Sequence, residues 1–348
     1  MRKVLVVQTW GIGDMVMTTP MLQCLRAGLP KAHVTVVAGS LAAGDVVRDS
    51  NLCDEVKTMS FRTASIFDIL TFFVSLRRER FDAAIVATRL SSKIAFLLRF
   101  LSGLKLVVGD GVDERGWGYT HWRRTNLGNH RSQDNIQILK LLIPHIENSE
   151  ALSPQFHLNQ TLVTDAAAAW RQHRLEGHVV MGVHPGCGLY EQDKKLPEQW
   201  CWEIISRFLL AFPEAKVALF FGPEDSVWGD GPENILKRIV RFQHLPLTVV
   251  AAFIEKTNVF LSGDTGLGHV AAAVGVPVVT VAGPTRINQT RPMGKRNLIV
   301  KTDHSLPCMP CFETPLFSNC PVSQECMTTV SAQRVFDAIA QTLKAAGN

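Results

Sequence analysis

Four short stretches of the sequence combine glycine with acidic, basic or imidazole side chains. They are Gly11-Ile-Gly13-Asp14, Lys194-Lys195, Glu224 after Gly222-Pro223, and the stretch from Ser262 to His269. Glycine lets a ligand approach the backbone closely, and carboxylates or imidazoles can move protons while ammonium groups neutralise phosphate. Together these residue types indicate a site for a phosphorylated ligand.

The stretch Ser262-Gly-Asp-Thr-Gly-Leu-Gly-His269 follows an apolar run and precedes small residues at helical spacing. A strand-to-helix turn of this kind directs backbone N–H groups and the positive end of a helix dipole at an anion. The candidate binding residues are Asp264, Thr265, Gly266 and His269. The alternative is an ordinary turn in which Asp264 only caps the helix.

The glycine turn at Gly11-Ile-Gly13-Asp14 is similar, but it is not a dinucleotide motif. Met17 stands where G-x-G-x-x-G needs its last glycine, and no acidic residue clearly closes the second expected strand. Asp14 at the start of a helix is either a cap or a carboxylate that faces a sugar hydroxyl as a general base.

Lys194, Lys195 and Glu224 each follow an expected strand in the second half of the chain. A lysine opposite the phosphate turn would neutralise a leaving diphosphate, whereas surface lysines are usually only solvated. Glu224 would accept a hydrogen bond from a ribose hydroxyl, or it is a turn residue.

Four of the eight cysteines are close in sequence: Cys308, Cys311, Cys320 and Cys326. Four thiolates at short spacing suit tetrahedral zinc or iron, so a structural metal is one expectation. The alternative is a set of small buried hydrophobic residues or reduced thiols.

The 348 residues carry a net charge of +5, with 46% hydrophobic and 19% charged residues. This composition supports two folded domains. No dense basic run is interleaved with aromatics, so nucleic acid is not expected as a partner. No apolar run reaches the roughly 20 residues that span a bilayer, and we expect a cytoplasmic protein.

Strands and helices are expected to alternate along both halves. In the first half, strands are expected at 3–7, 33–38, 54–58, 81–86 and 105–109, and helices at 15–27, 67–80, 91–101 and 134–142. In the second half, strands are expected at 179–183, 216–221, 259–262 and 278–282, and helices at 197–212, 247–255, 266–274 and 331–346. Residues 110–130 are expected to form a loop and 153–165 an extended linker.

This alternation predicts an α/β fold of two doubly wound, Rossmann-like domains, 1–160 and 161–348, that face a central cleft. Ligands bind at the carboxyl ends of the strands in such folds.

These motifs together resemble the ADP-heptose:lipopolysaccharide heptosyltransferases, which have the GT-B fold. The resemblance rests on the opening through Asp14, on His184-Pro-Gly186, on Lys194-Lys-Leu-Pro-Glu198 and on Asp264-Thr-Gly-Leu-Gly-His269. It also includes His130, Asn135, Gly222-Pro-Glu224, Gly283-Pro-Thr285 and the cysteine-rich tail.

The resemblance implies a role for each matched residue. Asp14 would be the general base, and Lys194 would contact the donor phosphate. Nucleotide-sugar contacts are expected from Gly13, Gly186, Lys195, Glu224, Asp264, Thr265, Gly266 and His269. The implied reaction is inverting transfer of heptose from ADP-heptose to a lipopolysaccharide core hydroxyl, with no cofactor required.

Two departures from the family pattern leave assignments open. The loop between His184 and Lys194 is longer than in some members, so either Lys194 or Lys195 could hold the phosphate. Val108 replaces an arginine that members often carry.

Three alternatives to this function stay open. They are another nucleotide sugar as donor, a capsule or protein acceptor, and a non-catalytic nucleotide-binding or assembly protein. A lipid-bearing acceptor would require peripheral attachment at the inner membrane.

Overall fold

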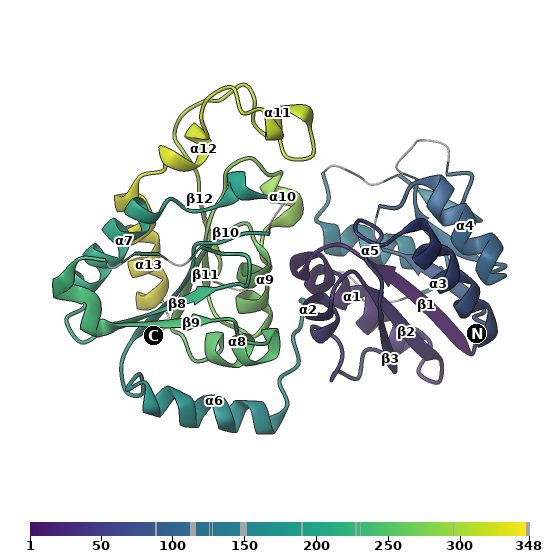
Figure 1. Ribbon diagram of the computed structural model, residues 1–348, viewed down its shortest axis with the longest axis horizontal. Coiled ribbons are helices and arrows are strands. Elements are labelled where there is room, and N and C mark those ends of the chain that lie inside the picture. The colour runs from purple at the N-terminus through teal and green to yellow at the C-terminus, as the bar shows by residue number, and fades with distance from the viewer. Residues whose placement is uncertain are drawn as a thin grey trace. The chain divides into compact units, whose positions relative to one another are not determined.

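The chain forms two compact units, Met1–His157 and Leu158–Asn348 (Figure 1). The computed structural model describes residues 1–87, 89–111, 116–124, 126, 128–146, 152–188, 191–226, 228–229, 231–294 and 296–345. The predicted boundary between 160 and 161 falls in the first turn of a helix, α6 (Gln160–Gln172).

The N-terminal unit is built on a six-stranded parallel sheet with the order β3-β2-β1-β4-β5-β6. Its strands are β1 (Lys3–Gln8), β2 (His33–Ala38), β3 (Glu55–Thr58), β4 (Ala83–Val86), β5 (Val107–Asp110) and β6 (His121–Arg123). The strand order reverses between β1 and β4. In open parallel sheets this reversal is the point where ligands bind, outside the carboxyl ends of the strands.

Helices cover both faces of this sheet. They are α1 (Ile12–Gly28), α2 (Leu41–Asp45), α3 (Ile66–Glu79), α4 (Ser92–Ser102) and α5 (Arg131–Lys140). The helices α3 and α4 pack on each other, and their buried residues share one core with β1, β4 and β5. The helices α1, α2 and α5 form the other layer, in which α1 contacts both α2 and α5.

Helix α1 continues through Pro20, which cannot donate a backbone hydrogen bond. The Thr19 hydroxyl donates to the Val16 carbonyl at 2.8 Å instead, so the acceptor that Pro20 leaves open is satisfied. This lets one helix of 17 residues run from the end of β1 across the sheet.

The C-terminal unit repeats the same topology, with the strand order β12-β11-β10-β7-β8-β9 and all strands parallel. Its strands are β7 (Val180–His184), β8 (Lys216–Phe221), β9 (Ile239–Gln243), β10 (Val259–Gly263), β11 (Val278–Val281) and β12 (Leu298–Val300). Here the order reverses between β7 and β10. Both strands are fully buried, as expected for the centre of a sheet covered on both faces.

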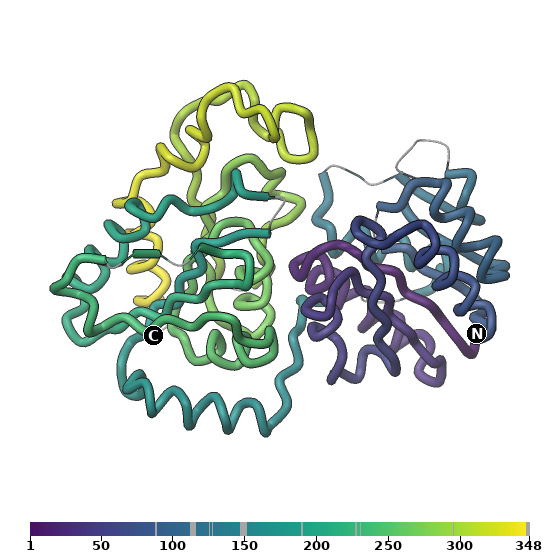
Figure 2. The backbone as a smooth tube through the Cα atoms, in the orientation of Figure 1, coloured from purple at the N-terminus to yellow at the C-terminus, as the bar shows by residue number. Residues whose placement is uncertain are grey.

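Two layers of helices flank this second sheet as well. The helices are α6, α7 (Glu198–Ala211), α8 (Leu247–Ile254), α9 (Gly266–Ala273), α10 (Ile287–Thr290), α11 (Pro315–Ser318), α12 (Glu325–Thr328) and α13 (Ala332–Lys344), with short 3-10 turns η1 (Gln192–Lys194) and η2 (Glu233–Arg238). Helices α7 and α13 pack together on one face, and α6, α8 and α9 form the other layer. Figure 2 shows the segment with α11 and α12 as loops that leave the sheet after β12 and return to α13.

The structure confirms the α/β class and two doubly wound domains, and it corrects four local predictions. Residues 153–165 are not an extended linker, because α6 begins at Gln160. Gly13 and Asp14 belong to α1 rather than to a turn. Residues 110–130 include the strand β6. The strands β9 and β12 were not predicted.

None of the helices in the described part of the chain is both long and apolar enough to cross a bilayer.

Candidate active site

The stretch from Ser262 to His269 lies at the strand-order reversal of the C-terminal unit. Ser262 and Gly263 end β10, and Thr265 is the N-cap of α9. Asp264 directly precedes this cap, so the N-cap is Thr265 and not Asp264. The first N–H groups of a helix have no partner within it, so the N-terminus of α9 offers backbone donors to an anion.

Asp264 is buried and held by two neighbours. The Thr290 hydroxyl donates to its Oδ2 at 2.6 Å, and His269 Nε2 lies 3.6 Å from its Oδ1. Burial opposes ionisation, but the hydrogen bond and charge of His269, with Lys194 and Thr290, outweigh it and lower the pKa of Asp264. The carboxylate is thus charged at neutral pH and fixes His269 in the turn.

Lys194 is a buried cation beside this turn. Its side chain is only 8% exposed, and its Nζ lies 2.9 Å from Glu191 Oε2 and 3.8 Å above the centre of the Phe312 ring. A Cβ on Gly263 would come within 3.0 Å of the Lys194 carbonyl, so the two loops touch. The geometry therefore brings the predicted lysine and the predicted turn together within one unit.

Lys195 and Glu224 are placed differently. Lys195 is half-buried and its ammonium donates to the Ser226 hydroxyl at 2.8 Å. Glu224 is exposed in the turn after β8. Of the two lysines, Lys194 is the one that is buried against the α9 turn.

His184 ends β7, the other strand of the reversal, and Gly186 lies two residues after it. A Cβ on Gly186 would lie 1.9 Å from the Asp225 carboxylate, so only glycine fits. Asp225 also accepts the Gly222 N–H at 2.7 Å. Burial lowers the pKa of His184 despite nearby Asp225, and the Nδ1 of the neutral ring donates to the Phe220 carbonyl at 3.0 Å.

Two threonine hydroxyls in the loops after β10 and β11 are buried without a hydrogen-bond partner in the described part of the chain. They belong to Thr265, at the α9 N-cap, and to Thr285, in the loop after β11. An unpaired buried hydroxyl is costly, and such groups are candidate donors to a ligand oxygen.

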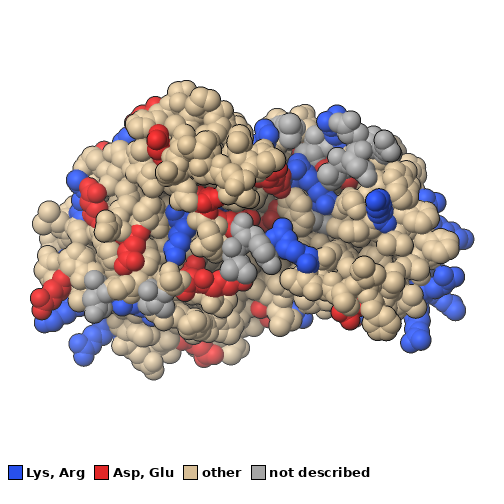
Figure 3. Space-filling view, turned by 45° about the horizontal axis from the view of Figure 1, so that its top comes forward, with Lys and Arg blue, Asp and Glu red and all other residues tan. Residues whose placement is uncertain are grey.

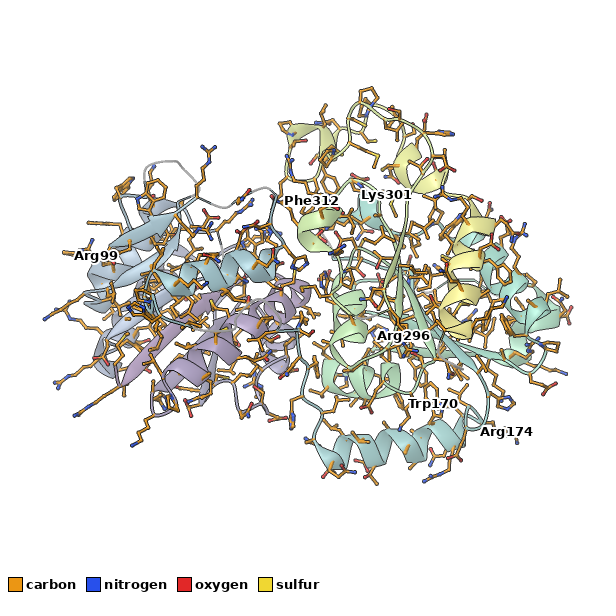
Figure 4. All side chains as sticks on the ribbon, turned by 180° about the vertical axis from the view of Figure 1, so that it is seen from behind. Arg99, Trp170, Arg174, Arg296, Lys301 and Phe312 are labelled. Carbon is orange, nitrogen blue, oxygen red and sulfur yellow. The ribbon has the colours of Figure 1, made fainter. Side chains whose placement is uncertain are left out.

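The cysteine-rich tail packs directly on this site. The N–H groups of Cys311 and Phe312 both donate to the Pro284 carbonyl at 3.0 Å. A Cβ on Gly283 would lie 2.3 Å from the Met327 sulfur, and the Gln324 amide binds Asp193 next to Lys194. Figure 4 shows Phe312 next to α10. The tail therefore supports both the Lys194 loop and the loop after β11.

The four clustered thiols do not form the predicted metal site. Among the described residues, which include all four cysteines, no group of three Cys, His, Asp or Glu side chains is arranged to hold a metal ion. Burial, and then the charges of the other three cysteines, raises the pKa of Cys326 to about 12. Burial likewise raises the pKa of Cys311. The arrangement of the described residues therefore gives no support to the predicted structural zinc or iron.

Asp14 lies at the corresponding place in the N-terminal unit. It is in the first turn of α1, directly after Gly13, and both residues are half-buried. The helix dipole stabilises a carboxylate at this position. Its backbone is fixed by the Thr18 hydroxyl, which donates to the Asp14 carbonyl at 2.7 Å.

A buried hydrogen-bond network connects this helix to the end of β1. Gln8 donates to the Thr18 hydroxyl at 3.1 Å and to the Ala87 carbonyl at 3.3 Å. Asn135, on α5, donates to the same hydroxyl at 3.2 Å. The network fixes the start of α1, and therefore Asp14, relative to β1, β4 and α5.

Arginines surround the carboxyl edge of the N-terminal sheet. Arg89 lies 3.6 Å from Asp110, Arg123 lies 3.8 Å from Asp134, and the Arg131 guanidinium is 5.3 Å above the Trp10 ring. Val108, in contrast, is fully buried in β5. His130 caps α5 through its ring nitrogen, which accepts the Ser132 N–H at 3.2 Å.

Several residues of this site were not identified from the sequence. Phe312 and Thr290 contact the predicted residues only because distant segments meet in the fold, whereas Glu191 pairs with Lys194 three residues along the same loop. Asp225 is adjacent to the predicted Glu224, and the Gly222-Pro223 turn gave no signal to choose between them. Trp10 lies within the opening motif and Arg131 follows His130, but their contact depends on tertiary structure.

Comparison with known proteins identifies the group to which the chain is similar. The lipooligosaccharide heptosyltransferase 2 of Campylobacter jejuni is 21% identical over 345 residues, which are 95% of this chain and 96% of that protein. A family 9 glycosyl transferase from Veillonella parvula superimposes with a TM-score of 0.77 at 18% identity, covering 99% of this chain and 97% of that one.

The E. coli ADP-heptose LPS heptosyltransferase II superimposes with a TM-score of 0.74 at 18% identity, and the match covers both chains fully (100% of each). These similarities show a common fold, the GT-B fold. In addition, residues 69–320 match the family model described as glycosyltransferase family 9 (heptosyltransferase). Because this match includes most of the chain, the protein belongs to glycosyltransferase family 9, the heptosyltransferases.

Proposed function

We propose that the enzyme transfers heptose from ADP-heptose to a hydroxyl of a lipopolysaccharide core acceptor, with inversion at the anomeric carbon. The observation that carries this proposal is Lys194, a buried ammonium against the N-terminal turn of α9. A buried cation beside unpaired hydroxyls and a helix N-terminus suits a diphosphate. The donor is suggested by the name of the E. coli heptosyltransferase II.

In the proposed reaction the acceptor oxygen attacks the anomeric carbon while the bond from that carbon to ADP breaks. The electron pair of this bond leaves with ADP, so negative charge grows on the diphosphate. Lys194, the α9 turn from Asp264 to His269 and the hydroxyl of Thr265 stabilise that charge. Prearranged donors of this kind are worth about 3–4 kcal/mol each where they have been measured.

Asp14 takes the proton that the acceptor hydroxyl loses. A carboxylate in the first turn of α1 is held by the Gln8–Thr18–Asn135 network, which supports a fixed orientation. This step balances without a redox cofactor. Gly13 and Gly186 allow close approach of the ligands, and Lys195 and Glu224 are further contacts to the donor.

The acceptor is proposed to contact the arginines at the carboxyl edge of the N-terminal sheet. Arg89, Arg123 and Arg131 suit an acidic or phosphorylated glycan. A lipid-linked acceptor places the reaction at the cytoplasmic face of the inner membrane. A capsule glycan or a protein hydroxyl would be an alternative acceptor.

Two measurements test this function. ADP-heptose is supplied with a panel of core, capsule and peptide acceptors, and mass spectrometry detects the addition of one heptose residue. In parallel, the thermal unfolding midpoint is compared with ADP, UDP and GDP, since a ligand that binds only the native state raises it. Selective stabilisation by ADP supports the donor.

Two other results would point elsewhere. Selective stabilisation by UDP or GDP would indicate another nucleotide sugar, and no stabilisation by any nucleotide would favour a non-catalytic assembly protein.

A further inference from the structure

The outer surface of α3 and α4 in the N-terminal unit carries large apolar side chains. On α3, Phe67 is 74% exposed and Val74 is 48% exposed. On α4, Phe100 is 68% exposed and Phe96 is 40% exposed. A helix that faces only water normally has polar residues on its outer side, so this surface requires an explanation.

These side chains lie opposite the buried stripes of their helices. Helix α3 turns Phe73 and Leu76 into the core, and α4 turns Ala95 and Leu98 into the same core. At helical spacing, Phe67 and Val74 share one outer row, and Phe96 and Phe100 share another. Helices α3 and α4 lie side by side (Figure 1) and share one core with the sheet. The residues opposite that core, including both outer rows, therefore face away from the sheet.

The aromatic rings on α4 extend into the following loop. Phe96 stacks on Phe100 with 5.9 Å between the ring centres, and it contacts Trp117 at 5.4 Å. Trp117 is itself 49% exposed. We call Phe67, Val74, Phe96, Phe100 and Trp117 the aromatic face.

Basic residues accompany the aromatic face. Arg78 continues the outer row of α3, Lys93 begins that of α4, and both are exposed. The carboxylates of α3 are engaged, since Asp68 closes the capping box with Ser65 and Glu79 binds Lys57. Helix α4 contains no acidic residue. In Figure 3, Lys and Arg line the right-hand edge of this unit, where Asp and Glu are scarce.

We infer that the aromatic face docks this enzyme onto an anionic lipid surface. Aromatic side chains partition into the interface between headgroups and acyl chains, and neighbouring basic residues bind anionic headgroups. The inference gives a physical site to the membrane attachment that the proposed lipid-linked acceptor requires, and in that respect it depends on the proposed function. Binding itself needs neither donor nor acceptor.

Charge favours a membrane over a second copy of the chain as the occupant. A two-fold contact would place the same patch on both copies. Arg78 and Lys93 would then meet their own equivalents, and like charges across an interface oppose association. An anionic lipid surface satisfies both the rings and the cations.

Flotation of the full-length protein with vesicles tests the inference. One vesicle type is rich in phosphatidylglycerol and the other is pure phosphatidylcholine. We expect the protein to bind the anionic vesicles more tightly, and we expect added salt to release it because salt screens surface charge. Equal binding to both vesicle types, or no binding to either, would overturn the proposal.

Two double variants assign the binding to the aromatic face. F67S/F100S should weaken binding about ten-fold or more, because each ring buries apolar surface in the interface. R78Q/K93Q should weaken it about 25-fold, since each basic residue near an anionic surface contributes about five-fold. If both variants bind anionic vesicles as tightly as the wild type, the aromatic face is not the membrane-docking surface.

The matched controls lie in the C-terminal unit. Leu210 is 83% exposed on α7, and Lys237 is exposed in η2. L210S and K237Q should bind vesicles as the wild type does. The thermal midpoint of every variant, measured without ligand, verifies folding. If the wild type is a dimer and F67S/F100S is a monomer, the aromatic face is a self-association surface. The membrane-docking proposal would then be wrong.

These outcomes separate the inference from the proposed function. If vesicles bind but heptose transfer fails, the proposed reaction is wrong and the docking surface remains. If heptose is transferred to a soluble acceptor without vesicle binding, only the docking surface is lost.

Discussion

The two units share one strand topology, yet the ends of their sheets carry opposite chemistry. In the C-terminal unit, the helix after the reversal begins with Gly266 and leaves its positive end to a ligand, with buried Lys194 beside it. In the N-terminal unit, the first turn of α1 contains Asp14, so a carboxylate of the protein itself lies at that end. The same strand topology therefore carries a helix N-terminus suited to an anion in the C-terminal unit. In the N-terminal unit it carries the carboxylate of Asp14 at the equivalent helix end.

Under the proposed function, this difference would divide one reaction between a donor site and a base. A helix N-terminus that begins with glycine binds phosphate, whereas one with an acidic residue in its first turn presents a base. The comparison can be tested by changing one residue in each unit. A change in the N-terminal unit should reduce transfer, and a change in the C-terminal unit should weaken ADP binding.

The largest effect is expected for Asp14→Asn. The amide keeps the shape of the side chain but cannot accept the proton, and general-base catalysis is worth roughly 10²–10⁴-fold. Heptose transfer should therefore fall by about that factor, while ADP affinity stays close to that of the wild type. Initial rates and calorimetric titration with ADP measure the two quantities separately.

An Asp14→Asn enzyme that transfers heptose at nearly the wild-type rate would remove Asp14 as the base. Equal losses of transfer and of ADP binding would show that the two units do not divide the roles.

The next effect in size is expected for Lys194→Ala. Loss of a charged donor to the diphosphate should weaken ADP about ten- to a hundred-fold, because such hydrogen bonds contribute about 1.5–3 kcal/mol. Adenosine, which has no phosphate, should bind unchanged. Titration of both ligands measures the difference.

Lys195→Ala is the comparison variant. It should weaken ADP binding less than Lys194→Ala does, since Lys195 binds Ser226 and is only half-buried. Loss of ADP binding in Lys195→Ala but not in Lys194→Ala would reverse the assignment of the two lysines.

A smaller effect is expected for Phe312→Leu. Leucine keeps the apolar contact but removes the ring face under the Lys194 ammonium. A cation–π contact of this kind is worth about 0.5–2 kcal/mol, so ADP should bind about two- to ten-fold more weakly. Phe312→Tyr, which retains the ring, should restore binding. If the leucine variant binds ADP as the wild type does, the ring does not position the lysine.

The smallest effect is the pH dependence of stability that His184 contributes in the C-terminal unit. Gln8 ends β1, whereas His184 ends β7, and only the histidine titrates. Its native pKa is lowered from 6.5 by burial, so the unfolded chain takes up a proton first as the pH falls. The free energy of unfolding is therefore at its full value above pH 6.5 and decreases below it, by at most about 1.4 kcal/mol per pH unit.

Urea unfolding at neutral and mildly acidic pH measures this slope in the wild type and in His184→Gln. The variant should show a shallower dependence on pH. An identical slope in both proteins would show that other groups cause the acid sensitivity.

The sequence predicted the α/β class and the turn before α9 because they depend on local patterns, whereas the predicted turn at Gly13 and Asp14 is the first turn of α1. Apolar runs define buried strands, and Gly266 with Gly268 marks the start of α9. The edge strands β9 and β12 were missed, since both are partly exposed and their hydrophobic pattern is weak. The start of α6 was missed because polar residues around the Asn159 N-cap resemble a linker.

The contacts to Lys194 could not be predicted, for a different reason. Phe312 is far from Lys194 along the chain, and only the fold of the tail against Pro284 brings them together. The cysteine spacing suggested a metal, but spacing does not specify whether four sulfurs point at a common centre.

Helix α6 has a practical consequence for dividing this protein. Trp170 of α6 is 6.4 Å from Phe242 and 6.2 Å from Phe253, ring centre to ring centre, and Figure 4 shows it between α6 and the rest of its unit. An expression fragment that starts at the first strand, Val180, would lack this helix and uncover both phenylalanines. A recombinant C-terminal module must therefore begin before Asn159, and shorter fragments should aggregate even though they keep every strand of the sheet.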